Sequence, residues 1–213
     1  DVLYLALEDN EESLQQRLGL LLQGMPAPDR LTFALEWKRT NQGGLDLLEA
    51  WLTEHPDSAR LIIVDVLAKI RPRAKGGNGN GYEEDYDVCD ALKRLSDRFR
   101  VSILLIHHLR KMPSGDPVDQ ILGSVGMSGS PDTAWVWRRA RKETKGTLFV
   151  TGRRIKEETE HVLEWDPLTV SFADLGDADL FARTKEQDEV LEIIRSEAPR
   201  EVRLKEIATL LGK

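Results

Sequence analysis

The sequence has one cysteine, only short apolar runs and no excess of positive charge, and each of these features narrows the classes of protein that it fits. Its 213 residues contain one cysteine, Cys89. This excludes an internal disulfide framework and a CxxC metal or redox motif, and it indicates a reducing compartment, for which we expect the cytoplasm. No uninterrupted apolar run exceeds about six residues, whereas a transmembrane helix needs about 20, so we expect no membrane span. Because 37 acidic residues face 30 basic ones, nucleic-acid binding would have to depend on local basic patches.

The residues that are present predict an α/β fold in the first half of the chain. A hydrophobic fraction of 40% is sufficient for one domain with a real core, with or without a small appendage. Asp9 and Glu12 form a capping-box pattern that predicts the start of a first helix, which Gly24 ends. The alternation of strands and helices is typical of a parallel sheet flanked by helices. Strands are expected at 2–7, 31–35, 61–66 and 101–106, and two further helices at 45–52 and 83–99.

The second half of the chain has a different pattern. Strand signals follow one another without helices between them, which predicts antiparallel pairing; they lie at 133–137, 147–151, 161–165 and 168–172. We expect residues 1–175 to form a core, 176–184 a linker, and 185–213 a partial helical unit of the helix-turn-helix or winged-helix kind.

Carboxylates end two of the predicted parallel strands. Asp65 ends the strand 61–66, and Glu8 and Asp9 follow the first strand, at the sheet edge where α/β proteins bind their ligands. A carboxylate such as Asp65 can hold magnesium, usually through water, and Glu8 can orient and deprotonate an attacking water. The structural alternatives are that Asp65 caps the next turn and that Asp9 stabilises a helix N-terminus.

Histidines and arginines add further candidates. His107 and His108 follow the strand 101–106 and point to opposite faces, which disfavours a shared metal ion; one could contact a phosphate, or both could be exposed strand-end residues. Eight basic residues and one acidic residue lie between Arg138 and Lys156, and seven acidic residues with no basic one lie in 157–177. Such segregation fits a solvated hairpin, or a hairpin that presents Arg153 or Arg154 to a neighbouring subunit as an arginine finger.

The order of five segments resembles a known family. The segments ALED at 6–9, IIVDVLAKIRP at 62–72, IHHLRK at 106–111, GSVGMSG at 123–129 and VTGRR at 150–154 are similar to the motif series of RecA-fold P-loop ATPases of the RepA type. These are the hexameric replicative helicases of plasmids and their phage relatives. The resemblance covers residues 1 to about 175. It implies an ATP- and Mg²⁺-dependent helicase in DNA replication, assembled as a ring on single-stranded DNA.

The resemblance also implies roles for individual residues. Glu8 would be the catalytic glutamate, Asp65 the Walker B aspartate that holds Mg²⁺ through water, and His108 the polar sensor. Arg153, with Arg154 as competitor, would be the finger acting in trans. The other candidates are Gly123 and Ser124, which would bind nucleotide together with Glu8 and Asp65, and the channel-loop cations Lys69, Arg71, Arg73, Lys75, Arg110 and Lys111, which would contact DNA phosphates.

Two features depart from the pattern of that family. No GxxxxGK[ST] occurs in the sequence, so we expect these residues to be part of a longer chain and not to hydrolyse ATP efficiently alone. An arginine that the family carries after the Gly/Ser loop is replaced by Trp135 or a neighbour. Two other functions stay open: a DNA-binding regulatory module on a degenerate ATPase scaffold, and a RecA-like recombination or repair ATPase. The basic loops 69–81 and 111–131 could also be solubilising surface segments.

Overall fold

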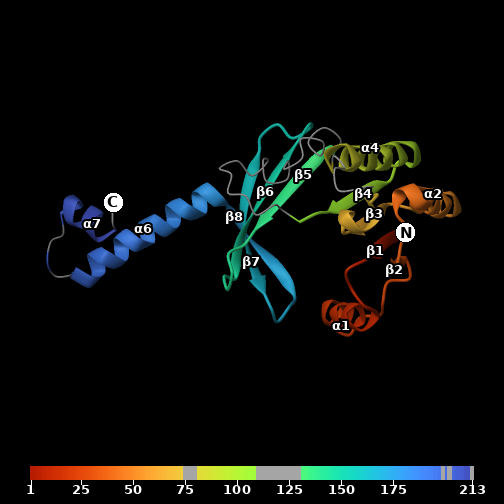
Figure 1. Cartoon of the computed structure of the whole chain (residues 1–213). Helices are drawn as coiled ribbons and strands as arrows, with labels where there is room; N and C mark the ends of the chain where they lie inside the picture. Colours follow the sequence, from red (N-terminus) through yellow and green to blue (C-terminus); the bar gives the residue numbers. More distant parts are fainter. Residues whose placement is uncertain (74–80, 109–130, 198–199, 201–202, 212–213) are drawn as a thin grey trace. The chain divides into compact units, whose positions relative to one another are not determined.

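The chain consists of two compact units, which Figure 1 shows with their elements labelled. The structure, a computed structural model, describes residues 1–73, 81–108, 131–197, 200 and 203–211. Unit 1 contains residues 1–134 and 152–154, and unit 2 contains residues 135–151 and 155–213.

Unit 1 contains a four-stranded parallel sheet in the order β2-β1-β3-β4. Its strands are β1 (Val2–Ala6), β2 (Leu31–Ala34), β3 (Leu61–Asp65) and β4 (Ser102–Ile106). The register pairs Ala6 of β1 with Asp65 of β3, and Asp65 with Ile106 of β4. The carboxyl ends of three strands therefore meet at one edge of the sheet, as the sequence predicts.

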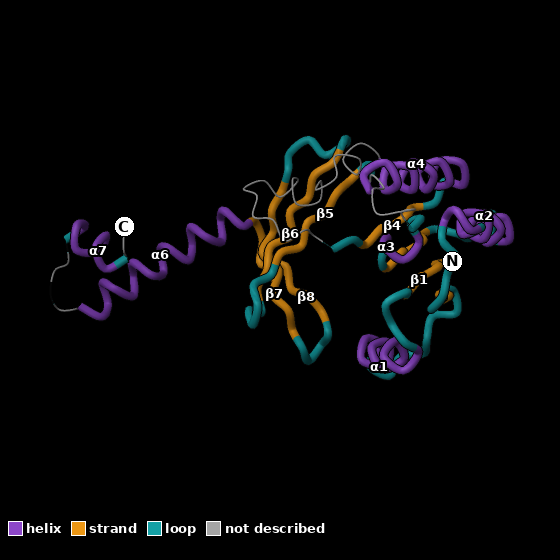
Figure 2. Tube along the Cα trace, in the orientation of Figure 1, coloured by secondary structure: helices purple, strands orange, loops and turns teal. Residues whose placement is uncertain are grey.

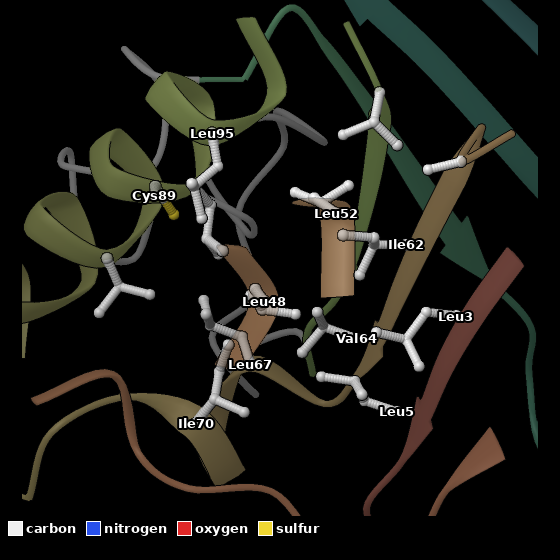
Figure 3. Packing of buried hydrophobic residues seen from close by; sticks show 14 residues of the cluster. Leu3, Leu5, Leu48, Leu52, Ile62, Val64, Leu67, Ile70, Cys89 and Leu95 are labelled. Atoms are coloured by element: carbon white, nitrogen blue, oxygen red, sulfur yellow. The ribbon is translucent and has the colours of Figure 1, made fainter. Parts of the chain in front are cut away.

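In its described residues, unit 1 also contains four helices and a 3-10 turn. They are α1 (Glu11–Leu22), the 3-10 turn η1 (Thr40–Gln42), α2 (Gly44–Glu54), α3 (Leu67–Ile70) and α4 (Gly81–Phe99). Of these, α2, α3 and α4 supply residues to the core of the unit. Figure 2 shows α2 and α4 side by side. In Figure 3, leucines from α2 and α4 and the two ends of α3 meet the aliphatic side chains of β1 and β3. Alternate strand residues are buried, so one face of each strand supplies this core.

Two local predictions in unit 1 are wrong. The N-cap of α1 is Asn10 rather than Asp9, because the Asn10 side chain accepts a hydrogen bond of 2.8 Å from the Ser13 N–H. The expected irregular loop from Lys69 onward begins later, because 67–70 form the short helix α3. The side chains of Leu67 and Ile70 are buried in the core and fix this turn.

Burial makes the single cysteine unreactive. Cys89 lies on α4 among core residues, and burial, with a smaller contribution from Asp85, raises its pKa to about 11. The thiolate is the nucleophilic form, so its fraction at pH 8 is about one in a thousand. We expect iodoacetamide to alkylate the folded chain at least about 100-fold more slowly than the urea-unfolded chain. Equal rates, measured by mass spectrometry, would contradict this burial.

A buried carboxylate joins α4 to the chain after α3. Asp85 on α4 is buried, and the Arg71 guanidinium donates to its two oxygens at 3.0 and 3.3 Å. The Arg39 guanidinium in turn donates to the main-chain oxygen of Arg71. Arg71, a candidate for DNA binding, therefore has a structural partner that the sequence did not reveal.

Removing the Arg71 side chain should destabilise unit 1. Arg71→Ala leaves the buried Asp85 without its partner, which we expect to cost about 2 kcal/mol in the free energy of unfolding. Hydrogen exchange of the β3 amides measures this loss in unit 1 alone. Arg73→Ala is the matched control, since Arg73 is exposed two residues further on. An equal effect of both substitutions would argue against the Asp85 contact.

Unit 2 contains an antiparallel sheet in the order β5-β6-β7-β8. The strands are β5 (Thr133–Arg138), whose first two residues belong to unit 1, β6 (Lys145–Gly152), β7 (Thr159–Asp166) and β8 (Ser171–Asp177). The predicted last strand, 168–172, is shifted. Asp166 accepts hydrogen bonds from the Leu168 N–H (2.9 Å) and the Thr169 hydroxyl (2.8 Å), so these residues form a turn before β8.

Two helices follow this sheet, α6 (Ala178–Glu197) and α7 (Leu204–Leu210). In the expected linker 176–184, the residues from Ala178 onward are helical, because α6 begins directly after β8. Asp177 caps it by accepting hydrogen bonds of 3.0 Å from the N–H groups of Asp179 and Leu180. The assignment of 185–213 to a DNA-binding unit stays a prediction. Within the described residues, no helix is both long and apolar enough to cross a membrane.

Candidate active site

The candidate site lies at the carboxyl edge of the parallel sheet. Glu8 and Asp9 follow β1, Asp65 is the last residue of β3, and His108 lies two residues after β4. The Leu7 N–H donates to the Asp65 main-chain oxygen at 2.8 Å, so the ends of β1 and β3 stay paired beyond the strands. The fold thus brings Glu8, Asp65 and His108 to one edge of the sheet, with Asp9 next to Glu8.

Glu8 and His108 are in direct contact although they lie 100 residues apart. The distance between His108 Nε2 and Glu8 Oε2 is 3.2 Å, and the side chains of His108 and Glu8 are 74% and 43% exposed, respectively. An exposed carboxylate beside an imidazole can accept a proton from a water molecule. His107, the other candidate histidine, does not make this contact.

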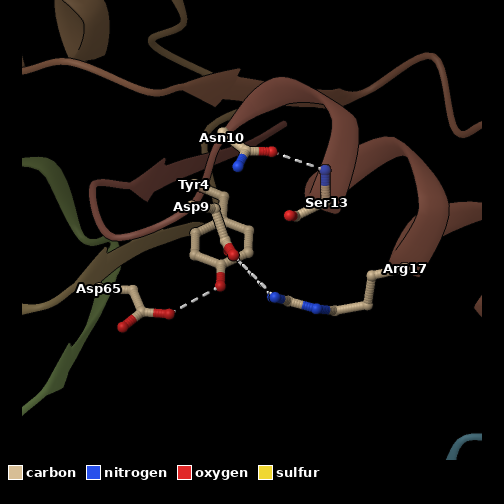
Figure 4. A network of polar contacts seen from close by, with 6 residues as sticks. All are labelled: Tyr4, Asp9, Asn10, Ser13, Arg17 and Asp65. Atoms are coloured by element: carbon tan, nitrogen blue, oxygen red, sulfur yellow. Dashed lines mark hydrogen bonds and ion pairs between the residues drawn. The ribbon is translucent and has the colours of Figure 1, made fainter.

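Asp65 is oriented by a tyrosine that the sequence analysis missed. In Figure 4 the Tyr4 hydroxyl of β1 donates to Asp65 Oδ2 at 2.9 Å. Burial first, and the hydrogen bond to Asp65 second, raise the pKa of Tyr4 to about 12, so the phenol keeps its proton at neutral pH. The available signal was a single hydroxyl-bearing side chain in the otherwise aliphatic run VLYLAL.

A second ion pair lies beside this contact. The Arg17 guanidinium on α1 donates to both oxygens of Asp9, at 2.7 and 2.9 Å. The hydrogen bond to Asp9 is the main cause of a raised pKa for Arg17. Both Asp9 oxygens are thus engaged in a bidentate pair that ties α1 to the end of β1, which leaves Glu8 as the carboxylate open to solvent.

The described carboxylates of the site are too few to bind a metal ion by themselves. They fit a magnesium ion whose other ligands come from a nucleotide and from water. Among the residues that the structure describes, no three or more His, Cys, Asp or Glu side chains form a metal-binding group. Magnesium in nucleotide sites is bound through one or two carboxylates together with phosphates and waters. Asp65 would supply one such carboxylate, and its Oδ2 already accepts the hydrogen bond from Tyr4.

Comparison with known proteins now identifies the family. The sequence profile of a family described as the AAA domain matches residues 1–114, more than half of the chain. The chain belongs to this AAA domain family. Among curated protein sequences, none matches it.

Solved structures share the fold of most of this chain. One of them is an ATPase domain that has a TM-score of 0.64 at 11% identity, covering 82% of this chain and 74% of that one. A DnaB-like replicative helicase, solved in a study of its interactions with primase, has a TM-score of 0.63 at 10% identity and covers 81% of this chain. The matched part is 51% of the helicase chain, so the present chain spans about half the length of that helicase. The expected RecA-like α/β core, with its antiparallel strands on the C-terminal side, is confirmed as a fold.

The two finger candidates, Arg153 and Arg154, lie in the turn between β6 and β7. Arg153 and Arg154 are exposed there, and among the described residues neither side chain makes an ion pair. The Arg153 N–H donates to the Asp132 main-chain oxygen at 3.0 Å. A Cβ on Gly152 would lie 2.5 Å from that same oxygen, so only glycine allows this close approach. The turn is thus fixed to the chain before β5, while the guanidinium groups stay available.

The remaining candidates divide into described and undescribed residues. Lys69 and Arg73 are exposed, and Arg71 is paired with Asp85. The others lie outside the described residues, namely Lys75, Arg110, Lys111, Gly123 and Ser124.

Proposed function

We propose that this AAA domain is the ATP-hydrolysing part of a RepA-like DNA helicase or translocase of the plasmid or phage type. It would act in DNA replication in the cytoplasm, with ATP and Mg²⁺, as a hexameric ring on single-stranded DNA. The observation that carries the proposal is the meeting of Glu8, Asp65 and His108 at one sheet edge, with Glu8 and His108 in contact. The similarity to a solved ATPase domain and to a DnaB-like replicative helicase supports the same class of enzyme.

Each side chain has a defined task in this proposal. Glu8 accepts a proton from the attacking water, and His108 contacts the same carboxylate. Asp65 holds Mg²⁺ through water, and Tyr4 fixes the rotamer of Asp65 through its hydroxyl. Bound Mg²⁺ would offset the charge of the phosphates. The P-loop that cradles these phosphates is absent from the 213 residues, so we propose that turnover requires a longer polypeptide that supplies it.

The remaining assignments belong to the same proposal. Arg153, or Arg154 in its place, would reach the phosphates of a neighbouring subunit, and Gly123 and Ser124 would contact nucleotide. The DNA contacts would come from the loops after β3 and β4, through the cations Lys69, Arg71, Arg73, Lys75, Arg110 and Lys111. The exposed guanidinium groups of Arg153 and Arg154 support the first of these roles.

A fusion tests the proposed function. A P-loop segment placed ahead of Asp1 should give an ATPase that single-stranded DNA stimulates, and light scattering should show a ring-sized oligomer. Asp65→Asn should lower the turnover about 100-fold, because it weakens the magnesium site. Asp57→Asn, at an exposed position before β3, should leave the turnover unchanged. Full activity of the Asp65 variant would exclude this site, and DNA binding without any turnover would favour a regulatory module.

A further inference from the structure

Unit 2 carries an exposed group of aromatic side chains that the proposed site does not use. We call Trp135, Trp137, Trp165 and Phe172 the aromatic face; it contains three of the five tryptophans of the chain. The Phe172 ring lies 5.0 Å from that of Trp137 and 4.9 Å from that of Trp165. Trp135 is 62% exposed and Phe172 is 46% exposed. Large apolar surface of this kind marks a binding site more often than a chance feature.

The geometry of the sheet builds this face. Trp135 and Trp137 lie two residues apart on β5 and share a face, whereas Val136 between them is buried on the opposite side. Trp165 of β7 pairs directly with Phe172 of β8. A Cβ on Gly146 would lie 2.7 Å from the Trp137 ring, so glycine on β6 makes room for this indole. The face therefore depends on residues from all four strands.

A basic turn adjoins the aromatic face. Residues 139–144 connect β5 to β6 and carry Arg139, Arg141 and Lys142, all of them exposed. In the part of the chain that the structure describes, none of these three cations has an ion-pair partner. The Trp165 N–H donates to the Thr144 main-chain oxygen at 2.8 Å, which places the turn against the aromatic cluster.

Glu143 lies in the turn itself, whereas the acidic side chains of the neighbouring strands have partners of their own. Glu164 is 3.8 Å from Lys145, and Asp166 holds the turn before β8. Asp174 accepts a hydrogen bond from the Gly176 N–H and pairs with His161. The three cations of the turn outnumber its one carboxylate, Glu143, so the turn stays net positive and favours an anion.

We propose that the aromatic face and the basic turn together bind single-stranded nucleic acid. Bases stack on the exposed rings of Trp135 and Phe172, and phosphates lie near Arg139, Arg141 and Lys142. Aromatic stacking beside cations is how proteins hold single strands without sequence preference, because every base has a π-face. This inference rests on the proposed function for the choice of single-stranded nucleic acid as the ligand. The surface itself is separate in sequence from the loops 69–81 and 111–131, to which the proposed function assigns DNA contacts.

Fluorescence anisotropy of labelled oligo(dT) with the 213-residue chain tests this surface. We expect Trp135→Ala to weaken binding about tenfold through the loss of one stacked base. Replacing Arg139, Arg141 and Lys142 by glutamine should flatten the slope of log affinity against log salt by about 2, because three phosphate contacts are lost. Tyr86→Ala is the matched control, since Tyr86 is 44% exposed on α4 of unit 1.

The possible outcomes distinguish a failure of this inference from a failure of the proposed function. Unchanged affinity and salt slope in both variants, or no binding by the wild-type chain, would overturn the inference. If both variants bind DNA like the wild-type chain and the P-loop fusion shows DNA-stimulated ATPase activity, the inference fails but the proposed function does not. If Trp135→Ala binds DNA tenfold more weakly and the fusion hydrolyses no ATP, the proposed function fails but the inference does not. If Trp135→Ala instead dissolves a dimer in sedimentation without changing DNA affinity, a second copy of the chain covers the face and the inference fails.

Discussion

Glu8→Gln in the P-loop fusion is expected to lower the ATP turnover number by about 100- to 1000-fold, the range that general bases contribute. Glutamine has nearly the same shape and can still contact His108, which lies 3.2 Å from Glu8 Oε2. It cannot accept a proton from water at neutral pH. We therefore expect the affinity for ATP, measured by equilibrium binding, to stay within about twofold. The defect should lie in the chemical step alone.

Glu12→Gln provides the matched control for this experiment. Glu12 is exposed in the first turn of α1, four residues from Glu8 and outside its contact with His108. Its replacement should leave both turnover and affinity unchanged. If Glu8→Gln kept wild-type turnover, Glu8 would not be the base. If it lost ATP affinity in parallel with turnover, its role would be in binding.

Leu48→Ala should produce the largest loss of stability among the substitutions considered, about 3 kcal/mol in the free energy of unfolding of unit 1. Leu48 lies on α2 and is 0% exposed, with its side chain in the core against β1 and β3. Truncation removes buried methyl groups and leaves a cavity that the surrounding leucines fill only in part. Both effects reduce stability.

The neighbouring residue provides a chemically matched control. Leu47→Ala changes the same side chain on the same helix, but Leu47 is 40% exposed. We expect a loss below about 1 kcal/mol at this position. Hydrogen exchange of amides in β1 and β3 is the appropriate measurement, because it reports on unit 1 without requiring both units to unfold together. Similar losses at positions 47 and 48 would contradict the packing of α2.

The sequence predicted the edge of the sheet well because local patterns determine it. Apolar runs ending in Glu8 and Asp65 indicate strands, and alternation with helices makes them parallel, so their carboxyl ends must meet. The pairs Tyr4–Asp65 and Arg71–Asp85 were not predictable in this way. They join residues 61 and 14 positions apart, respectively, whose proximity depends on the packing of whole elements.

Errors at element boundaries had a different origin. Several residues near a boundary could cap or break an element, and their relative free energies are close. Asn10 rather than Asp9 caps α1, and the Asp9 carboxylate binds Arg17 instead. Asp177 starts α6 where a small and polar stretch favoured a linker. Which of two adjacent polar residues caps a helix depends on their tertiary contacts, and these cannot be predicted from the local sequence.

The two acidic groups of the candidate site differ in how firmly they are held. Asp65 is preorganised: a partly buried phenol fixes one of its oxygens before any ion arrives, so binding an ion costs little rotational entropy. Glu8 and His108 meet in solvent, where such contacts contribute little and exchange readily with water. A bound ligand, rather than the fold, would therefore decide when Glu8 is aimed. The edge of the sheet thus combines a fixed carboxylate, Asp65, with a base, Glu8, that is aligned only when a ligand is bound.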